Sequence, residues 1–199
     1  MAFEYHIVLA VIGIGVGTIR YALYFRDIFR GSVKPHVFSW FVWGLLTGIV
    51  SVAQVIAGGG PGAWITIYIT VMCLTISAVA YFKGTTDITR FDWVCFIAAL
   101  LAIGVWAVTS TPLYALFIAM AADTLGYLPT YRKSIKNPDE ESALGFGIAS
   151  LRSVFGIAAL ASFNPTTLIY PVFMLVADAV AALIVVVRRV QLGRPRVWR

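Results

Sequence analysis

Long apolar stretches alternate with short gaps that are either charged or rich in glycine and proline. A helix needs roughly 20 mostly apolar residues to cross the hydrocarbon layer of a membrane. The pattern predicts seven such helices, at residues 5–26, 37–57, 62–82, 91–109, 112–132, 143–162 and 166–187. Of the 199 residues, 60% are apolar and only 12% are charged, which cannot supply the polar surface of a soluble domain of this size. We therefore predict an all-α membrane protein with seven transmembrane helices.

The gaps between these segments alternate in charge. Lys and Arg residues follow the first, third, fifth and seventh segments, whereas the turns after the second, fourth and sixth contain neither. Because positive residues stay on the cytoplasmic side of a membrane, we predict that the N-terminus lies outside and the C-terminus in the cytoplasm. The net charge of +6 then reflects topology signals and contacts with anionic headgroups. The predicted partner is the lipid bilayer, and nucleic acid is not predicted as one.

The first three segments resemble the last three, and the fourth has no counterpart. Two stretches align without a gap, pairing Thr18 with Thr124, Tyr21 with Tyr127, Phe25 with Tyr131, Arg26 with Arg132, Arg30 with Lys136 and Trp40 with Phe146. This predicts a 3+1+3 plan, in which the unpaired helix lets both triplets enter the membrane from the same side as parallel repeats. The predicted parts are a first triple-helix bundle (1–86), a linker transmembrane helix (87–110), a second triple-helix bundle (111–190) and a basic cytoplasmic tail (191–199).

This plan resembles the SWEET, semiSWEET and PQ-loop (MtN3/saliva-like) transporter superfamily. The likeness includes Leu128-Pro129-Thr130 near the end of the fifth segment and the basic exit Arg132-Lys133, with Ser142 downstream. The family's Pro-Gln pair is Pro129-Thr130 here and Leu23-Tyr24 in the first repeat, so the chain looks like a divergent bacterial member. The resemblance implies alternating access, in which one triple-helix bundle rocks against the other.

Four ionisable residues interrupt the apolar segments: Arg20, Asp123, Arg152 and Asp178. A charge at the centre of a membrane costs at least about 2.5–3.5 kcal/mol on insertion scales, so such residues face a partner or water. At a rise of about 1.5 Å per residue, Asp123, Arg152 and Asp178 all fall near the middle of the membrane. One interpretation is a substrate- or proton-binding site between the repeats. The other is an ion-paired strut, with Arg152 bridging or alternating between the two carboxylates. Arg20 is nearer the cytoplasmic end and is expected to snorkel.

Two tryptophans, Trp40 and Trp43, lie three residues apart and therefore on one face of the second segment. They predict either the wall of a binding pocket or an aromatic anchor at headgroup depth. The stretch Ser39-Trp40-x-x-Trp43 is also similar to the nicotinamide riboside permeases, which share the 3+1+3 plan. Pro129 removes a backbone hydrogen bond from its helix and predicts a gating hinge.

The sequence contains no Ser/His/Asp arrangement, no glycine-rich phosphate loop and no cluster of His or Cys residues. We predict that the protein is not an enzyme and uses no metal or cofactor. The predicted function is a facilitator or proton-coupled transporter in the inner (plasma) membrane, carrying a small polar solute such as a sugar, an amino acid or a nucleoside-like vitamin precursor. The alternative is a non-transporting scaffold or receptor component on the same fold. A homodimer is compatible with both.

Overall fold

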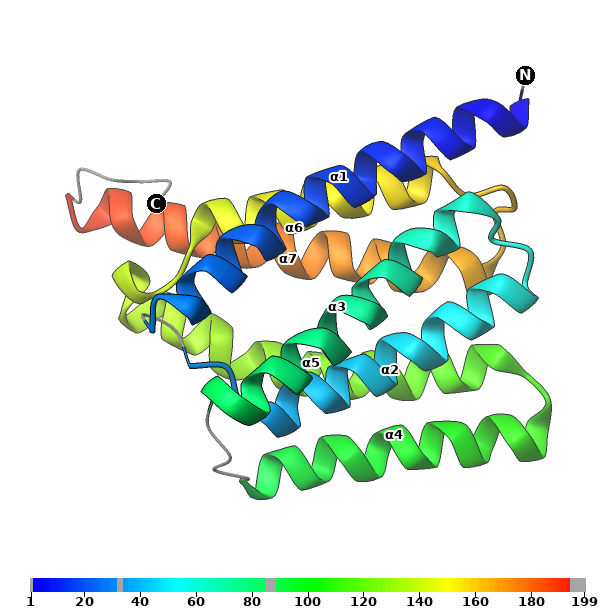
Figure 1. Cartoon of the computed structure of the whole chain (residues 1–199), viewed down its shortest axis with the longest axis horizontal. Helices are drawn as coiled ribbons and strands as arrows, with labels where there is room; N and C mark the ends of the chain where they lie inside the picture. Colours follow the sequence, from blue (N-terminus) through cyan, green and yellow to red (C-terminus); the bar gives the residue numbers. More distant parts are fainter. Residues whose placement is uncertain (1, 32–33, 85–88, 194–199) are drawn as a thin grey trace.

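The computed structural model describes residues 2–31, 34–84 and 89–193. In these ranges the chain is almost entirely helical and runs back and forth along one direction (Figure 1). The elements in order are α1 (Ala2–Phe29), α2 (Val37–Ile56), α3 (Pro61–Lys83), α4 (Arg90–Thr109), α5 (Pro112–Lys136), the 3-10 helix η1 (Pro138–Glu140), α6 (Ala143–Ala158) and α7 (Pro165–Gln191). Each of the seven predicted segments therefore corresponds to one α-helix.

Several helices begin at residues that satisfy their free N–H groups. The side chain of His36 accepts a hydrogen bond from Ser39 N at the start of α2, and Ser142 Oγ accepts one from Gly145 N at the start of α6. Asn164 and Thr167 form a reciprocal capping box at the start of α7. These caps determine the residues at which the apolar helices α2, α6 and α7 begin.

Among the residues that the structure describes, five helices are long and apolar enough to cross a membrane: α1, α2, α3, α5 and α7. The apolar stretches in α4 and α6 are shorter, at Phe96–Thr109 and Ala143–Ala158. The predicted sixth segment extended to residue 162, but α6 ends at Ala158 and the chain turns there toward α7. Large apolar side chains are exposed along the bundle, including Ile19, Phe82, Leu101, Val108 and Leu183. The fold is thus all-α, with an apolar exterior suited to a membrane.

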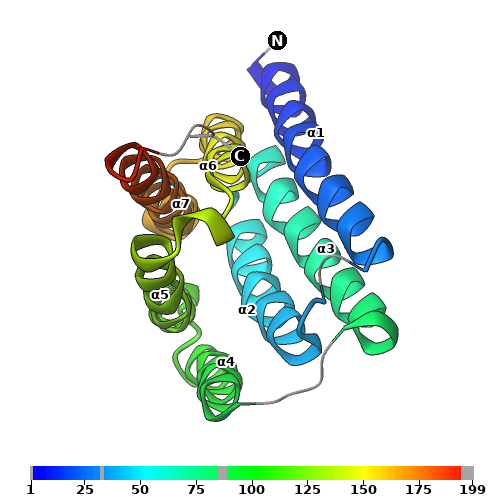
Figure 2. The ribbon, with the colours of Figure 1, turned by 90° about the vertical axis from the view of Figure 1, so that its left-hand side faces the viewer.

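The helices form two groups of three with α4 beside them (Figure 2). In the first group, α3 packs against both α1 and α2, and in the second group, α7 packs against both α5 and α6. The two groups meet where α1 contacts α6 and where α2 contacts α5, and α4 packs on α2 and α5. The space between the groups is therefore bordered by helices from both halves of the chain.

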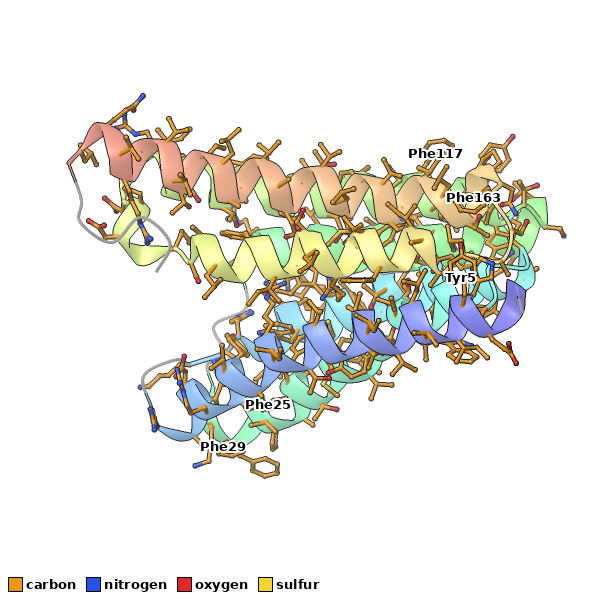
Figure 3. All side chains as sticks on the ribbon, turned by 90° about the horizontal axis from the view of Figure 1, so that it is seen from above. Tyr5, Phe25, Phe29, Phe117 and Phe163 are labelled. Carbon is orange, nitrogen blue, oxygen red and sulfur yellow. The ribbon has the colours of Figure 1, made fainter. Side chains whose placement is uncertain are left out.

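The two ends of the bundle differ in charge. Helices α1, α3, α5 and α7 all finish at one end, here named the basic end, where Arg26, Lys83, Lys136 and Arg188 lie in last turns. The opposite end, here named the neutral end, holds the turns at 57–60, 110–111 and 159–164. Figure 3 shows α1 beside α6 near Tyr5 and diverging from it toward Phe29. The groups therefore approach each other at the neutral end and separate at the basic end.

A buried arginine forms hydrogen bonds that join the end of α7 to the connection between α5 and α6. Arg189 is only 3% exposed. Its Nε and Nη2 atoms donate to Pro138 O at 3.1 and 2.9 Å, and Nη2 also donates to Glu141 O at 2.6 Å. A planar guanidinium suits this arrangement because it offers several donors in fixed directions.

We predict that Arg189→Lys lowers the Tm, because lysine keeps the charge but cannot reproduce these hydrogen bonds. Hydrogen bonds from charged groups contribute ~1.5–3 kcal/mol, which corresponds to a loss of roughly 3 °C or more in a protein of this size. The control is Arg188→Lys, because Arg188 Nε donates to Ile135 O in an exposed position where water can replace it. Thermal unfolding of both purified variants checks this, and equal decreases in Tm would contradict the assignment.

Candidate functional site

A cavity of about 170 Å³ lies between the two helix groups. Six helices contribute to its wall, and α4 is the one α-helix of the described structure that does not. Pockets for drug-sized ligands span roughly 300–1,000 Å³, so this cavity suits a smaller solute. All five residues that the sequence predicts to bind substrate or protons line it: Trp40, Trp43, Asp123, Arg152 and Asp178. The structure thus brings these residues together, and their role in binding stays a prediction.

The two carboxylates are each held by a tyrosine from the neighbouring helix. Tyr170 Oη on α7 donates to Asp123 Oδ2 on α5 at 2.9 Å, and Tyr127 Oη on α5 donates to Asp178 Oδ1 on α7 at 2.9 Å. Asp123 and Asp178 are 8% and 2% exposed. One tyrosine donates from α7 to α5 and the other from α5 to α7. The two hydrogen bonds therefore fix how these helices are rotated relative to each other.

Arg152 on α6 is buried in the cavity wall and has no hydrogen-bonding or ion-pair partner among the described residues. It is 2% exposed, and neither its Nε nor its Nη1 atom has a hydrogen-bond acceptor. The sequence led us to expect that Arg152 bridges Asp123 and Asp178, but within the described ranges it forms no ion pair with either. Tyrosines satisfy one oxygen of each carboxylate instead, and Asp178 Oδ2 is also left without a donor.

The stem of Arg152 packs against α1 at a glycine. A Cβ atom at Gly17 would lie 3.1 Å from Arg152 Cδ and 3.4 Å from Tyr68 Cε1. Such distances are tighter than ordinary van der Waals contact, so a larger residue at this position would push on the arginine. Gly17 belongs to the first group and Arg152 to the second. The guanidinium is therefore positioned by the contact between the two groups.

Aromatic rings form another part of the wall. The rings of Trp40 and Trp43 meet edge to face with centroids 5.3 Å apart, and Trp40 also contacts the ring of Tyr24 at 5.2 Å. Trp40 is half-buried, whereas Trp43 is 40% exposed. Both line the cavity, as the pocket interpretation requires, and the exposure of Trp43 is also compatible with an anchoring role.

At the neutral end, hydrogen bonds join the two groups of helices. Gln54 Nε2 donates to Thr167 O at 3.2 Å, Asn164 Nδ2 donates to Ala57 O at 2.9 Å, and the backbone N–H of Ala161 donates to Gly59 O at 3.1 Å. On this side lies a second cavity of about 30 Å³, which Arg152 also lines. The large cavity instead reaches from the helix middles toward the basic end, where the groups diverge (Figure 3).

Several lining residues were not predicted from the sequence. Arg20, which was expected to snorkel, lines the cavity, and so does the buried Cys73. The tyrosines Tyr127 and Tyr170 were not singled out at all. One signal could have found the first of them, because Tyr127 lies four residues after Asp123 and so on the same helix face.

The predicted hinge, Pro129, lies within α5, and its side chain falls outside the described residues. The hinge therefore stays a prediction.

We predict strong coupling between Tyr170 and Asp123 in a double-mutant cycle. Tyr170→Phe leaves a buried carboxylate oxygen without its donor, which costs roughly 1–3 kcal/mol and lowers the Tm. Asp123→Leu similarly strands the hydroxyl, but the double variant removes both partners and is expected to lose less than the sum of the single losses. Thermal unfolding measures the four stabilities of the cycle. The control is Tyr114→Phe, at an exposed site of α5, the helix that carries Asp123. Additive losses would show that the pair makes no net contribution.

In comparisons with known proteins, no protein-family model, no curated protein and no solved structure matches this chain. Inferences about function therefore depend on the cavity itself and on the residues that line it.

Proposed function

We propose that the protein is a membrane transporter for a small polar solute, working as a facilitator or by proton coupling. The observation that carries this proposal is Arg152, a buried residue that lines a cavity between two groups of helices and whose Nε and Nη1 atoms have no hydrogen-bond partner among the described residues. The solute would bind there, near the middle of the membrane, as in transporters built from repeated bundles. The lipid bilayer and the solute are the proposed partners, and a homodimer is compatible with this function.

The unpaired state of Arg152 favours a binding site over a structural strut. Removing a charge from water costs several kcal/mol, which a strut recovers only by pairing with an opposite charge at close range. Arg152 lines the same cavity as Asp178 but does not pair with it, and Asp178 Oδ2 is also free of a donor. A site that binds solute uses such groups, whereas a scaffold gains nothing from them.

Repeat-related positions in the structure support the 3+1+3 plan with parallel repeats. Tyr21 and Tyr127 occupy equivalent positions in the alignment and both line the cavity. The same holds for Trp40 and Phe146. The third helix of each group also packs between the other two, in α1–α3 and in α5–α7 alike. We propose that all seven helices span the membrane, including the shorter α4 and α6, on the plan that the SWEET and PQ-loop proteins use.

The two ends of the bundle suggest how access could alternate. We propose that the basic end is cytoplasmic and that this conformation faces inward, with the neutral end closed. Among the described residues, a few hydrogen bonds join the groups at this end, from Tyr5, Gln54, Asn164 and Ala161, so separating them is feasible. Rocking of α1–α3 against α5–α7, with α4 as the linker, would then open the neutral end and close the basic one.

We expect purified protein in proteoliposomes to take up a solute from a panel of sugars, nucleosides and amino acids, with and without a pH gradient. Asp123→Asn is expected to lower that uptake at least about tenfold, a change equivalent to ~1.4 kcal/mol. The same substitution at the half-buried Asp27, which pairs with Arg26 in α1 near the basic end and away from the cavity lining, is the control and should leave uptake intact. If no panel solute enters although the protein is folded, the scaffold or receptor interpretation replaces transport.

The proposed closure at the neutral end can be tested with Cys73, a native cysteine in the cavity wall. In a Cys95→Ala background, a small membrane-impermeant thiol reagent should modify Cys73 faster from the basic side. Gly62→Ala should raise modification from the neutral side, because the added Cβ would lie 2.9 Å from both Gly156 O and Leu160 Cα and force the groups apart there.

The matched control for this substitution is Gly104→Ala, because nothing lies within 4 Å of a Cβ at that position. It should leave the labelling unchanged. If Cys73 is modified faster from the neutral side when Gly62 is intact, the proposed conformation is contradicted. If Gly62→Ala leaves the ratio of the two modification rates unchanged, the role of the neutral-end contacts is contradicted.

A further inference from the structure

Two buried residues of opposite charge line the large cavity and have unused hydrogen-bonding capacity among the described residues. The Nε and Nη1 atoms of Arg152 have no acceptor, and the Oδ2 atom of Asp178 has no donor. Both side chains are 2% exposed, so bulk water does not satisfy them. They come from different helices, α6 and α7, and line the same cavity.

We propose that the transported solute is a small zwitterion of the amino-acid class with an apolar side chain. Its carboxylate would accept hydrogen bonds from the free N–H groups of Arg152, and its ammonium group would donate to Asp178 Oδ2. This inference rests on the proposed transport function and narrows it to one solute class.

Charge-assisted hydrogen bonds explain why a neutral polyol fits less well. Guanidinium–carboxylate and ammonium–carboxylate contacts are roughly twice as strong as hydrogen bonds between neutral groups. A sugar hydroxyl could occupy either position, but it would leave the desolvation of both buried charges poorly compensated. A zwitterion compensates both at once.

The other charged residues of the cavity favour a solute without net charge. Arg20 and Asp123 also line it, so the wall carries two arginines and two aspartates in formal balance. An anion such as a simple carboxylate would satisfy Arg152 but leave Asp178 without a donor, and a simple amine would do the reverse.

Volume and aromatic lining restrict the side chain of the solute. The cavity holds about 170 Å³, and its wall includes Trp40, Trp43, Phe146 and Met174. Aromatic faces attract an ammonium group and pack well against aliphatic carbons. These properties select a short apolar side chain over a charged or strongly polar one.

A matched set of probes tests the inference on the unmodified protein. L-valine and L-alanine carry both charges, isobutylamine lacks the carboxylate of valine, 3-methylbutanoate lacks its ammonium group, and 3-methylbutanamide and D-xylose are neutral. Equilibrium binding in detergent and counterflow in proteoliposomes should both rank a zwitterion at least about tenfold above every other probe, as expected for losing one charge-assisted contact.

Two variants connect this ranking to the residues. In Arg152→Gln, L-valine should bind no better than isobutylamine, and in Asp178→Asn no better than 3-methylbutanoate. Arg132→Gln, at an exposed position of α5, should keep the ranking of the unmodified protein. If either cavity variant fails to fold, the ranking on the unmodified protein still decides the question.

The outcomes separate this inference from the proposed function. Counterflow of D-xylose or 3-methylbutanoate at a rate equal to that of the zwitterions would overturn the solute class but leave transport standing. Absence of counterflow for these probes and for the wider panel of solutes would overturn both.

Discussion

A charge buried in a membrane protein needs a partner, and Arg152 has none within the described structure. The two carboxylates that line the same cavity each accept a hydrogen bond from a tyrosine instead, Asp123 from Tyr170 and Asp178 from Tyr127. Its stem rests on α1 at Gly17, so the guanidinium stands where the two groups of helices meet. A movement between the groups would change its environment, and under the proposed function this would connect solute binding to a change in conformation.

Under the proposed 3+1+3 plan, the two halves of the chain differ in their chemistry. In the repeat alignment Asp123 corresponds to Gly17, and Arg152 corresponds to Leu46. Leu46 packs in a core cluster with Ala119 and Ala122 of α5, next to Asp123, while Arg152 packs on Gly17 of α1. At each of these two interfaces, a charged residue of the second group therefore lies near a small or apolar residue of the first. The second group supplies most of the charge and the first supplies space and the tryptophans, so the cavity needs both.

The sequence predicts the helices well because apolar runs of this length have few alternatives. It also identifies Asp123, Arg152 and Asp178, since a charge within such a run is conspicuous. It cannot show which charges pair, because pairing depends on how each helix is rotated in the bundle. Tyrosines in apolar helices take many roles, so Tyr170 gives no comparable signal. The end of α6 at Ala158 was also missed, because the turn that follows it is itself apolar.

The most direct test of the central claim is an experimental structure of the protein in lipid nanodiscs, determined with and without saturating L-valine. The account predicts density for the solute between Arg152 and Asp178, with Tyr127 and Tyr170 still bonded to their carboxylates and no direct ion pair from Arg152 in the solute-free form. An Arg152 that pairs directly with Asp123 or Asp178 in both forms, with no solute in the cavity, would contradict it and would identify the charges as a structural strut.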